Sequence, residues 1–362
     1  MAGTLLVTGA TGYVGSCLAA RYLATTTGRV VLWAHAADAA EASNRRGALA
    51  ERFAPVLNRV TFAFGDLAAE PGFDRIDRAS ITEIVHAAAI TRFNVEAEVA
   101  DVVNRAGAER VFAFAATCPR LRHFAYLSTV YSTGLRSGTI AEALPREEPD
   151  FANHYEASKH RAERALVECY DHLPWSILRL ATIIADDEAG SVTQVNAFHN
   201  TLRLIRYGLL PLLPSLPEAP LYFVTGDFVV RSILKILQQE PRNQVWHLCH
   251  SREEMPTVQQ LLDIAFDTFA EEEEFRSRRL LKPPYTDYPT FKSLIAGLDG
   301  MASRVTVQAL RSVAPFAPQL YLCKNFVNDR VKALNGAAAP NKTALLAAAC
   351  RSLVGRRCER RQ

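Results

Sequence analysis

Tyr155 and Lys159 are the two residues whose types and spacing best fit acid–base chemistry. In a helix, side chains four positions apart lie on the same face, so the Lys159 ammonium would stand beside the Tyr155 phenol. A tyrosine with its ordinary pKa near 10 is a poor acid or base at neutral pH, and a neighbouring positive charge lowers that pKa toward the working range. The pair therefore predicts a tyrosine that exchanges a proton with a substrate oxygen. Taken alone, the same two residues would also fit an ordinary surface helix.

Three glycines near the start of the chain predict a phosphate-binding turn. Leu5 to Val7 form an apolar strand, and Gly9, Gly12 and Gly15 follow at three-residue intervals. The first two glycines let the backbone turn sharply and approach a ligand, and the third lets the next helix pack closely on the sheet. The helix N-terminus then faces the negative charge of a pyrophosphate. We expect a dinucleotide here, contacted by Gly9, Thr11, Gly12, Tyr13, Val14 and Gly15.

Together these motifs resemble the short-chain dehydrogenase/reductase superfamily. The match extends from residue 3 to about 250, and it includes Leu127-Ser128-Thr129 at the end of an apolar strand. The resemblance implies that Thr129 hydrogen-bonds the substrate oxygen, with Ser128 as the alternative. It also implies that Tyr155 transfers the proton and that Lys159 holds the nicotinamide ribose. The catalytic candidates are therefore Thr129, Tyr155 and Lys159.

Two further segments are similar to the cofactor cleft of this superfamily. Asp66 and Leu67 follow an expected strand at 60–64, where the aspartate of the family hydrogen-bonds the adenine. A second expected strand, at 81–85, leads through His86 to three small residues that leave room for the backbone to line the cofactor. These are Ala87, Ala88 and Ala89.

Two later positions match the family less closely. Asn104 corresponds to an asparagine on the next helix, although an exposed helix position fits it nearly as well. Arg179 stands where the family usually has Arg-Pro, and Leu180 departs from that pattern. The path of the chain after this strand is therefore not predicted by the resemblance.

The end of the second expected strand decides which cofactor is preferred. An acidic side chain there accepts hydrogen bonds from the NAD ribose, and a basic one accommodates the NADP phosphate. The strand is Arg29 to Trp33; no acid stands at its tip, and Asp38 comes late. His35 occupies about the position of a frequent arginine in the family, and Arg45 and Arg46 begin the following helix. These residues favour NADPH, with NADH as the alternative.

Strands and helices alternate up to about residue 185, which predicts an α/β fold with a doubly wound, Rossmann-type parallel sheet. Strands near 176–184 and 244–250 bracket an insertion. A charged stretch and Pro283-Pro284 suggest a surface loop within 270–345. The expected division is an NAD(P)-binding core at 1–185 with a returning segment at about 223–250, a smaller substrate-binding lobe at 186–222 and 251–345, and a basic tail at 346–362.

The apolar stretch from Leu209 to Tyr222 carries prolines at positions 211, 214, 217 and 220. Prolines at this interval favour a left-handed extended helix with three residues per turn. Its leucines would then form either a wall over a hydrophobic substrate or a rigid connector packed on the core. In both cases a heavily hydroxylated sugar nucleotide fits poorly.

The composition fits a globular enzyme without a nucleic-acid or membrane partner. The hydrophobic content of 49% is ample for a core, and the net charge of +3 depends on arginines in the last stretch, which we expect to be a frayed, solvated end. No uninterrupted apolar run is long enough to span a bilayer, and Met1 to Thr4 leads directly into the first strand, so we expect a cytoplasmic protein. The seven scattered cysteines predict free thiols. The alternating faces of an expected strand at 245–250 argue against a metal site at its histidines and cysteine, and we expect no metal.

Within the extended branch of the superfamily, three segments look most like the fatty acyl reductase and thioester reductase group, which is male-sterility-like. They are Val85 to Ala89 with Phe93, Ser128-Thr129, and Phe151 to Tyr155. The resemblance implies an oxidoreductase that transfers hydride from NADPH to an acyl thioester, aldehyde or ketone carbonyl. Its substrate would be a hydrophobic small molecule or a group bound to an acyl carrier. Dimerisation through a four-helix contact that includes the Tyr155 helix is common in this superfamily, so the resemblance allows a homodimer.

Other classes remain as alternatives. A nucleotide-sugar epimerase would keep NAD bound, and the absence of an acid at the second strand counts against it. A sugar dehydratase would show Asp-Glu after Thr129, where this chain has Val130-Tyr131. A non-catalytic regulator that senses NADP often lacks the tyrosine, and Tyr155 is present here.

Overall fold

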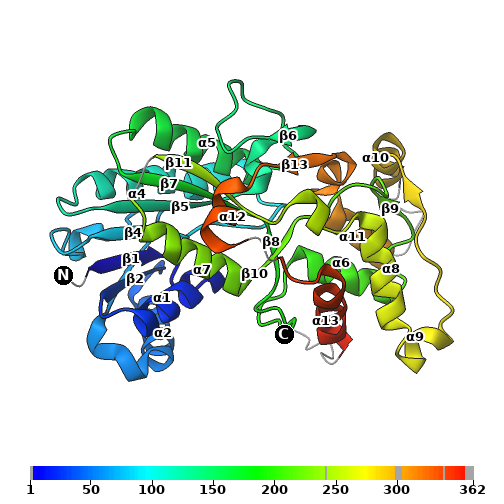
Figure 1. Cartoon of the computed structure of the whole chain (residues 1–362), viewed down its shortest axis with the longest axis horizontal. Coiled ribbons are helices and arrows are strands. Elements are labelled where there is room, and N and C mark those ends of the chain that lie inside the picture. The colour runs from blue at the N-terminus through cyan, green and yellow to red at the C-terminus, as the bar shows by residue number, and fades with distance from the viewer. Residues whose placement is uncertain (1–2, 241–242, 298–303, 337–338, 355–362) are drawn as a thin grey trace.

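The centre of the protein is a seven-stranded sheet whose strands are all parallel, in a computed structural model that describes residues 3–240, 243–297, 304–336 and 339–354 (Figure 1). The strand order is β11-β7-β5-β4-β1-β2-β3. The strands are β1 (Thr4–Thr8), β2 (Arg29–His35), β3 (Val60–Gly65), β4 (Glu83–His86), β5 (His123–Thr129), β7 (Trp175–Leu180) and β11 (Gln244–Leu248). The order reverses between β1 and β4, which is where open α/β sheets bind ligands at the carboxyl ends of their strands.

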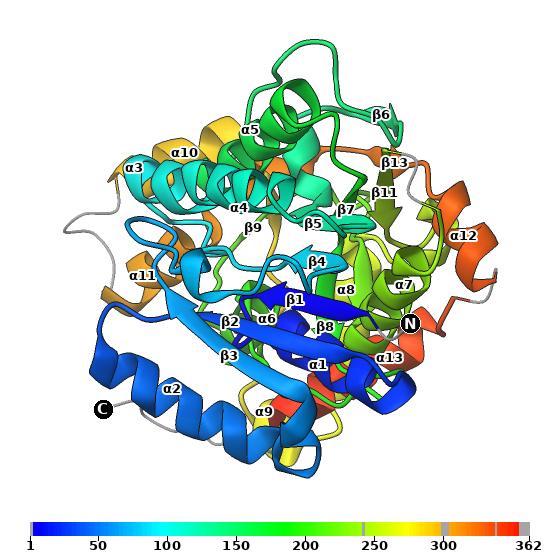
Figure 2. The same ribbon diagram turned by 90° about the vertical axis from the view of Figure 1, so that its left-hand side faces the viewer.

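Helices cover both faces of this sheet (Figure 2). One face packs against α1 (Tyr13–Thr25), α2 (Ala39–Arg52) and α7 (Gly226–Leu237), and the other against α4 (Gly107–Ala116) and α5 (His154–Cys169). Side chains alternate along a strand, so Leu5 and Val7 enter the first core while Leu6 enters the second. Because the two core clusters lie on opposite faces, the predicted doubly wound, Rossmann-type fold is confirmed.

A second, mostly helical lobe lies beyond the carboxyl ends of the strands (Figure 1). Its helices are α6 (Ala197–Arg206), α8 (Val258–Phe269), α9 (Glu273–Ser277), α10 (Tyr288–Gly297), α11 (Arg304–Val313) and α13 (Lys342–Val354). Two short parallel pairs accompany them: β8 (Thr182–Ala185) with β10 (Phe223–Thr225), and β9 (Leu213–Pro214) with β12 (Tyr285–Thr286). The surface loop expected at Pro283-Pro284 is present, since residues 280–284 belong to no helix or strand and Leu281 is 89% exposed. It is short, because helices that bury Phe275, Phe291 and Leu310 in the lobe core flank it.

Part of the expected lobe returns to the core. The strand β13 (Lys324–Phe326) pairs with β6 (Gly138–Ile140), and α12 (Asp329–Asn335) packs against α7 and β11. Phe326 and Val331 belong to the same buried cluster as the strand residues of the sheet. The expected lobe boundary of 251–345 therefore includes a segment that packs on the nucleotide-binding core.

The proline-rich stretch does not form a regular left-handed helix. Two of its residues form β9, and the Ala219 amide donates to the Leu216 carbonyl at 3.2 Å, which closes a turn. Leu210 and Leu213 are buried in the lobe core. These two leucines pack as a connector would, whereas Leu209, Leu212, Leu216 and Leu221 are only partly buried.

The first half of the expected basic tail is a packed helix. Leu346, Cys350 and Leu353 of α13 are buried, and the helix lies against α8. The expected frayed end is wrong up to Val354, because these apolar residues recur at helical spacing. The rest of the tail lies outside the described residues.

No helix in the described ranges is both long and apolar enough to cross a membrane. The six described cysteines are free thiols. Within the same ranges, no three His, Cys, Asp or Glu side chains are grouped so that they could hold a metal ion.

Candidate active site

The glycine loop lies between β1 and α1 and packs tightly on its surroundings. Gly9 has a φ of +73°, and a Cβ there would lie 2.7 Å from the Ala88 amide nitrogen. A Cβ at Gly15 would collide with the Gly9 carbonyl. Only glycine meets both requirements, and Gly12 places no side chain over the helix N-terminus. The loop therefore leaves backbone amides uncovered for an anion.

The neighbouring β4 end is tied to the glycine loop through Thr8. Its Oγ1 accepts from the Ala87 amide at 3.2 Å and the Ala88 amide at 3.3 Å, and it lies 2.7 Å from His86 Nδ1. This contact brings the predicted Ala87–Ala89 segment beside the predicted glycines, as a shared cofactor cleft requires.

Other loop residues point away from that cleft. The Tyr13 side chain packs over Gly226, and burial together with its hydrogen bond to Asp186 raises the pKa of Tyr13. Val14 packs against the core. The Tyr13 side chain thus lies on the Asp186 side of the loop, where it also lines a cavity.

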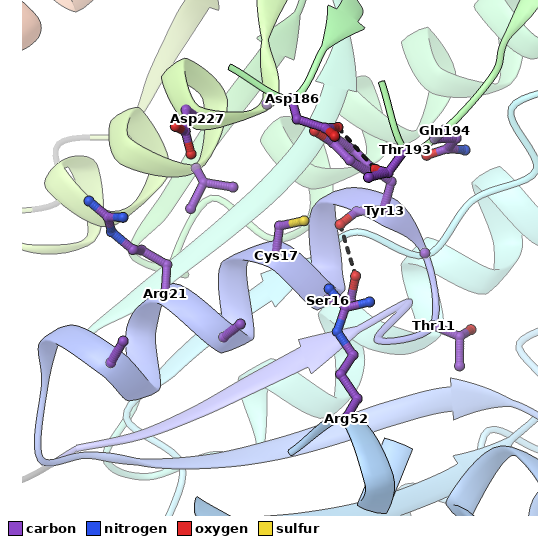
Figure 3. Close-up of a pocket in the computed structure, with 15 residues that line it drawn as sticks. Thr11, Tyr13, Ser16, Cys17, Arg21, Arg52, Asp186, Thr193, Gln194 and Asp227 are labelled. Carbon is purple, nitrogen blue, oxygen red and sulfur yellow. Dashed lines mark hydrogen bonds between the residues drawn. The ribbon is translucent and has the colours of Figure 1, made fainter. Parts of the chain in front are cut away.

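A cavity of about 780 Å³ runs along α1 and meets the glycine loop at one end (Figure 3). Thr11 and Gly12 line that end, and Arg21, Asp186 and Asp227 line the remainder. Thr129, Tyr155 and Lys159 are not among its lining residues. The cavity is thus distinct from the catalytic candidates.

An acidic side chain of α2, which was not predicted from the sequence, lies near the tip of β2. The Glu41 carboxylate lies 3.9 Å from His35 Nδ1 and accepts two hydrogen bonds from Arg45, at 3.0 and 2.5 Å. Arg45 also donates to Thr11 Oγ1 at 3.3 Å. Asp38 caps α2 by accepting from the Glu41 amide, which sets the first turn so that Glu41 faces the strand end. The acid appears six residues after the strand, too late to stand out in the sequence.

The remaining residues near this tip divide into two groups. Asp66 lies 3.7 Å from His35 Nε2, which brings two predicted cofactor residues together. Leu67 is buried in the core, and Arg46 stacks on Phe62 and Phe64. The arginines do not begin the following helix as expected, because α2 begins at Ala39.

Thr129 and Tyr155 are brought together at the carboxyl end of β5. Asn153 caps α5 through the Glu156 amide at 3.0 Å, and this places Tyr155 in the first turn. Burial raises the pKa of Tyr155, while the hydrogen bond from Thr129 opposes that rise. Ser128, by contrast, lies near the buried Glu163 carboxylate, whose pKa it helps to lower. Of the two alternatives, the geometry favours Thr129.

Lys159 is buried one helical turn after Tyr155. Its Nζ donates to the Leu127 carbonyl at 2.5 Å and lies 4.2 Å from the centre of the Tyr126 ring. Burial lowers the pKa of Lys159 to about 7, although the Glu163 carboxylate opposes this. The expectation that Lys159 lowers the pKa of Tyr155 is not met here, because burial dominates both groups.

Asn104 is a buried connector. It lies in a π-helical turn (Asp101–Ala106), accepts from the Ile90 amide at 2.8 Å, and donates to the Ile90 carbonyl at 2.9 Å and to Ser158 Oγ at 3.1 Å. The alternative of an exposed helix position is therefore wrong. Asn104 fixes the segment after Ala89 against α5.

Several comparisons with known proteins bear on this site. The sequence profile described as male sterility protein matches residues 7–233. The chain belongs to the male sterility protein family. It is an extended short-chain dehydrogenase/reductase and an NAD(P)-dependent enzyme, as expected from the motifs. No curated protein matches its sequence significantly.

Solved structures with low sequence identity share the fold of this family member. The terminal R domain from the myxalamid PKS-NRPS biosynthetic pathway is 22% identical, with 98% of this chain and 91% of that chain covered and a TM-score of 0.75. A thiolation-reductase di-domain from an archaeal non-ribosomal peptide synthetase is 17% identical, with coverages of 98% and 71% and a TM-score of 0.66. UDP-glucuronic acid 4-epimerase from Bacillus cereus in complex with NAD is 17% identical, with coverages of 97% and 98% and a TM-score of 0.65.

Proposed function

We propose that the protein is an NADPH-dependent reductase that transfers hydride to the carbonyl of a hydrophobic acyl thioester bound to an acyl carrier. The observation that carries this proposal is the hydrogen-bonded pair of Thr129 and Tyr155, next to the end of β4 that packs on the glycine loop. The R domain and the thiolation-reductase di-domain among the similar structures support a carrier-bound thioester. Aldehyde or ketone reduction would use the same residues.

The residues present fit a nicotinamide dinucleotide. The glycine loop leaves no side chain over the N-terminus of α1, and the Lys159 amine is buried with one carbonyl acceptor, so it retains further donors. The loop backbone would hold the pyrophosphate, and Lys159 would hold the ribose next to the nicotinamide. The bound cofactor supplies the hydride.

Thr129 and Tyr155 would hold the carbonyl oxygen of the substrate and stabilise the charge that develops on it. Tyr155 then gives its proton to that oxygen as hydride adds to the carbonyl carbon. For a thioester the product of this step is a hemithioacetal. Its carbon–sulfur bond breaks with proton transfer to sulfur, and an aldehyde and a free thiol leave.

The preference for NADPH is also a proposal, and it rests on His35 and Arg45. Glu41 modifies the sequence argument, because an acid does lie near the tip of β2. Since Arg45 binds that carboxylate at 2.5 Å, the charge of Glu41 is compensated by its partner. An NAD-dependent epimerase remains the second candidate, because Glu41 would accept ribose hydroxyls if Arg45 turned away.

The direct test follows NADPH oxidation optically, with purified protein and an octanoyl-pantetheine thioester, and in parallel with octanal. We expect thioester consumption with release of one thiol for each NADPH oxidised during the first reduction. Turnover of octanal alone would make the protein a carbonyl reductase. If the protein binds NADPH tightly but reduces neither the thioester nor octanal, the proposal is contradicted, and epimerisation or NADP sensing becomes the function to test.

A further inference from the structure

Aromatic side chains from separate segments meet at Phe93, whose ring also contacts that of Tyr155. Phe93 follows β4, Tyr131 follows β5, and Phe316 comes from the C-terminal part of the chain. The centroid of the Phe93 ring lies 5.8 Å from that of Tyr155, 6.2 Å from that of Tyr131 and 5.7 Å from that of Phe316. Phe93, Tyr131 and Phe316 are each only partly buried. The catalytic tyrosine candidate therefore lies beside an apolar surface that is still accessible.

Phe316 is held in place by the residues on either side of Tyr155. Asn153 Nδ2 donates to the Pro315 carbonyl at 3.0 Å, and Gln319 Nε2 donates to Glu156 Oε2 at 2.8 Å. Asn153 is the N-cap of α5, and Glu156 lies in its first turn. The short segment that carries Phe316 is thus fastened at both ends to the helical turn that carries Tyr155.

The Glu156 carboxylate, which accepts the hydrogen bond from Gln319, is buried and has further hydrogen-bond donors. Its carboxylate also accepts from Asn153 Nδ2 at 3.0 Å and from the Ala152 amide at 3.2 Å, and none of its surface is exposed. Nearby, Lys324 Nζ donates to the Gly134 carbonyl at 2.6 Å. A buried carboxylate is costly unless its hydrogen bonds are satisfied, so this contact fixes the distance between the two segments closely.

Leu210 and Leu213 of the proline-rich stretch pack inside the lobe, and the ring contacts at Phe93 come from other segments. We propose that Phe316, together with Phe93, forms the wall against which the apolar substituent of the reacting carbonyl rests, and that Phe316 determines which acyl groups are accepted. This inference rests on the proposed function, because it assigns the substrate side of the same site.

The spacing of the two rings indicates how the substituent binds. A flat group held between two rings needs about 7 Å between them, twice a carbon–carbon contact of about 3.5 Å. The centroids of Phe93 and Phe316 are 5.7 Å apart and the rings are inclined by 50°. They therefore act as one continuous wall and not as a slot, which suits an alkyl chain or the face of a single ring.

The test compares Phe316→Ala and Phe316→Leu with a control, Tyr288→Ala. Tyr288 is a partly exposed aromatic residue of the same lobe, whose ring pairs with Tyr321. The measured quantity is the ratio of kcat/KM for octanoyl-pantetheine to that for acetyl-pantetheine, with the Kd of NADPH as a second readout. We expect Phe316→Ala to lower the ratio by about tenfold, because apolar contact is lost, and Phe316→Leu to retain most of it. The Kd of NADPH should stay unchanged in all three variants.

A ratio that Phe316→Ala leaves at the wild-type value would overturn the inference while the proposed function stands. To separate the two, calorimetry measures binding of the unreactive octanoyl amide analogue to the protein with NADP⁺. If the wild type binds the analogue but reduces neither the thioester nor the aldehyde, and Phe316→Ala weakens that binding about tenfold, Phe316 is shown to bind the acyl group while the proposed reduction fails. A wild type that neither reduces the thioester nor binds the analogue overturns both.

Discussion

Glu163 and Arg179 form a fully buried ion pair, with 2.6 Å between Arg179 Nη2 and Glu163 Oε2. The Glu163 carboxylate also accepts from Ser132 Oγ at 2.7 Å, and Arg179 Nη1 donates to the Ala143 carbonyl at 3.1 Å. Burial raises the pKa of Glu163, but the Arg179 guanidinium more than compensates, and the pKa is lowered. The pair joins α5, which carries Tyr155 and Lys159, to the next strand of the sheet.

Breaking this pair should destabilise the fold. Glu163→Gln leaves the Arg179 charge buried without its counter-charge, and we expect the free energy of unfolding to fall by about 3 kcal/mol. Urea denaturation measures the change. The control is Glu148→Gln, which breaks the half-exposed ion pair with Arg161 and should cost less than about 1 kcal/mol. Equal losses in the two variants would contradict the structural role of Glu163.

Tyr155→Phe should remove the proton donor with little change in structure. We expect kcat/KM for the thioester to fall by about 10³-fold, within the usual range for loss of a general acid, and the Kd of NADPH to stay unchanged. Tyr131→Phe is the matched control, because the hydroxyl of Tyr131 lies 3.1 Å from Thr182 Oγ1. If Tyr155→Phe keeps full activity, Tyr155 has no part in proton transfer.

Local patterns in the sequence predicted the parts of the site that depend on short spacing. The glycines of the loop are close neighbours in the sequence, and so are Tyr155 and Lys159, so local backbone geometry determines their relative positions. Glu41 and Phe316 were missed for a physical reason. Glu41 reaches the strand tip only through the capped first turn of α2. Phe316 is held against Phe93, near the turn that carries Tyr155, only through hydrogen bonds between segments distant in the chain.

The burial of Tyr155, Lys159 and α13 could not be predicted from the sequence either. The expected effect of Lys159 on the pKa of Tyr155 considered the two charges and not their desolvation, which the whole fold determines. The same holds for α13, whose basic residues suggested a solvated end although its apolar residues pack on α8.

Cofactor preference should respond in opposite directions to changes at the tip of β2. Glu41→Gln releases Arg45 to bind a 2′-phosphate, and we expect the ratio of kcat/KM for NADPH to that for NADH to rise about tenfold. Arg45→Ala should lower the same ratio. Arg46→Ala is the control, because that guanidinium stacks on Phe62 and Phe64. A ratio that moves only with Arg46 would show that another surface sets the preference.

Two glycine substitutions should have opposite effects on stability. Gly9→Ala puts a Cβ 2.7 Å from the Ala88 amide nitrogen at a φ of +73°, so we expect the free energy of unfolding to fall by about 2 kcal/mol and NADPH binding to weaken. Gly47→Ala, in the middle of α2 with nothing within 4 Å of its Cβ, should instead stabilise by about 0.5–1 kcal/mol. Thermal unfolding and NADPH titration of both variants check this, and a neutral Gly9→Ala would mean that the loop is not tightly packed.

The buried Lys159 amine should make stability depend on pH in a defined direction. Its pKa is about 7 in the folded protein against an ordinary value of 10.5, so the unfolded chain binds more protons between these values. The contribution of Lys159 to stability therefore becomes less favourable as the pH falls from about 10 to 7, and it levels off below 7. Relative to Lys159→Met, the cofactor-free wild type should lose stability over that window, as measured by urea denaturation at pH 7 and pH 9. Lys282→Met, which removes a half-exposed ammonium paired with Asp263, is the control. A constant difference between wild type and Lys159→Met across the window would mean that the amine is solvated and is not the buried group described here.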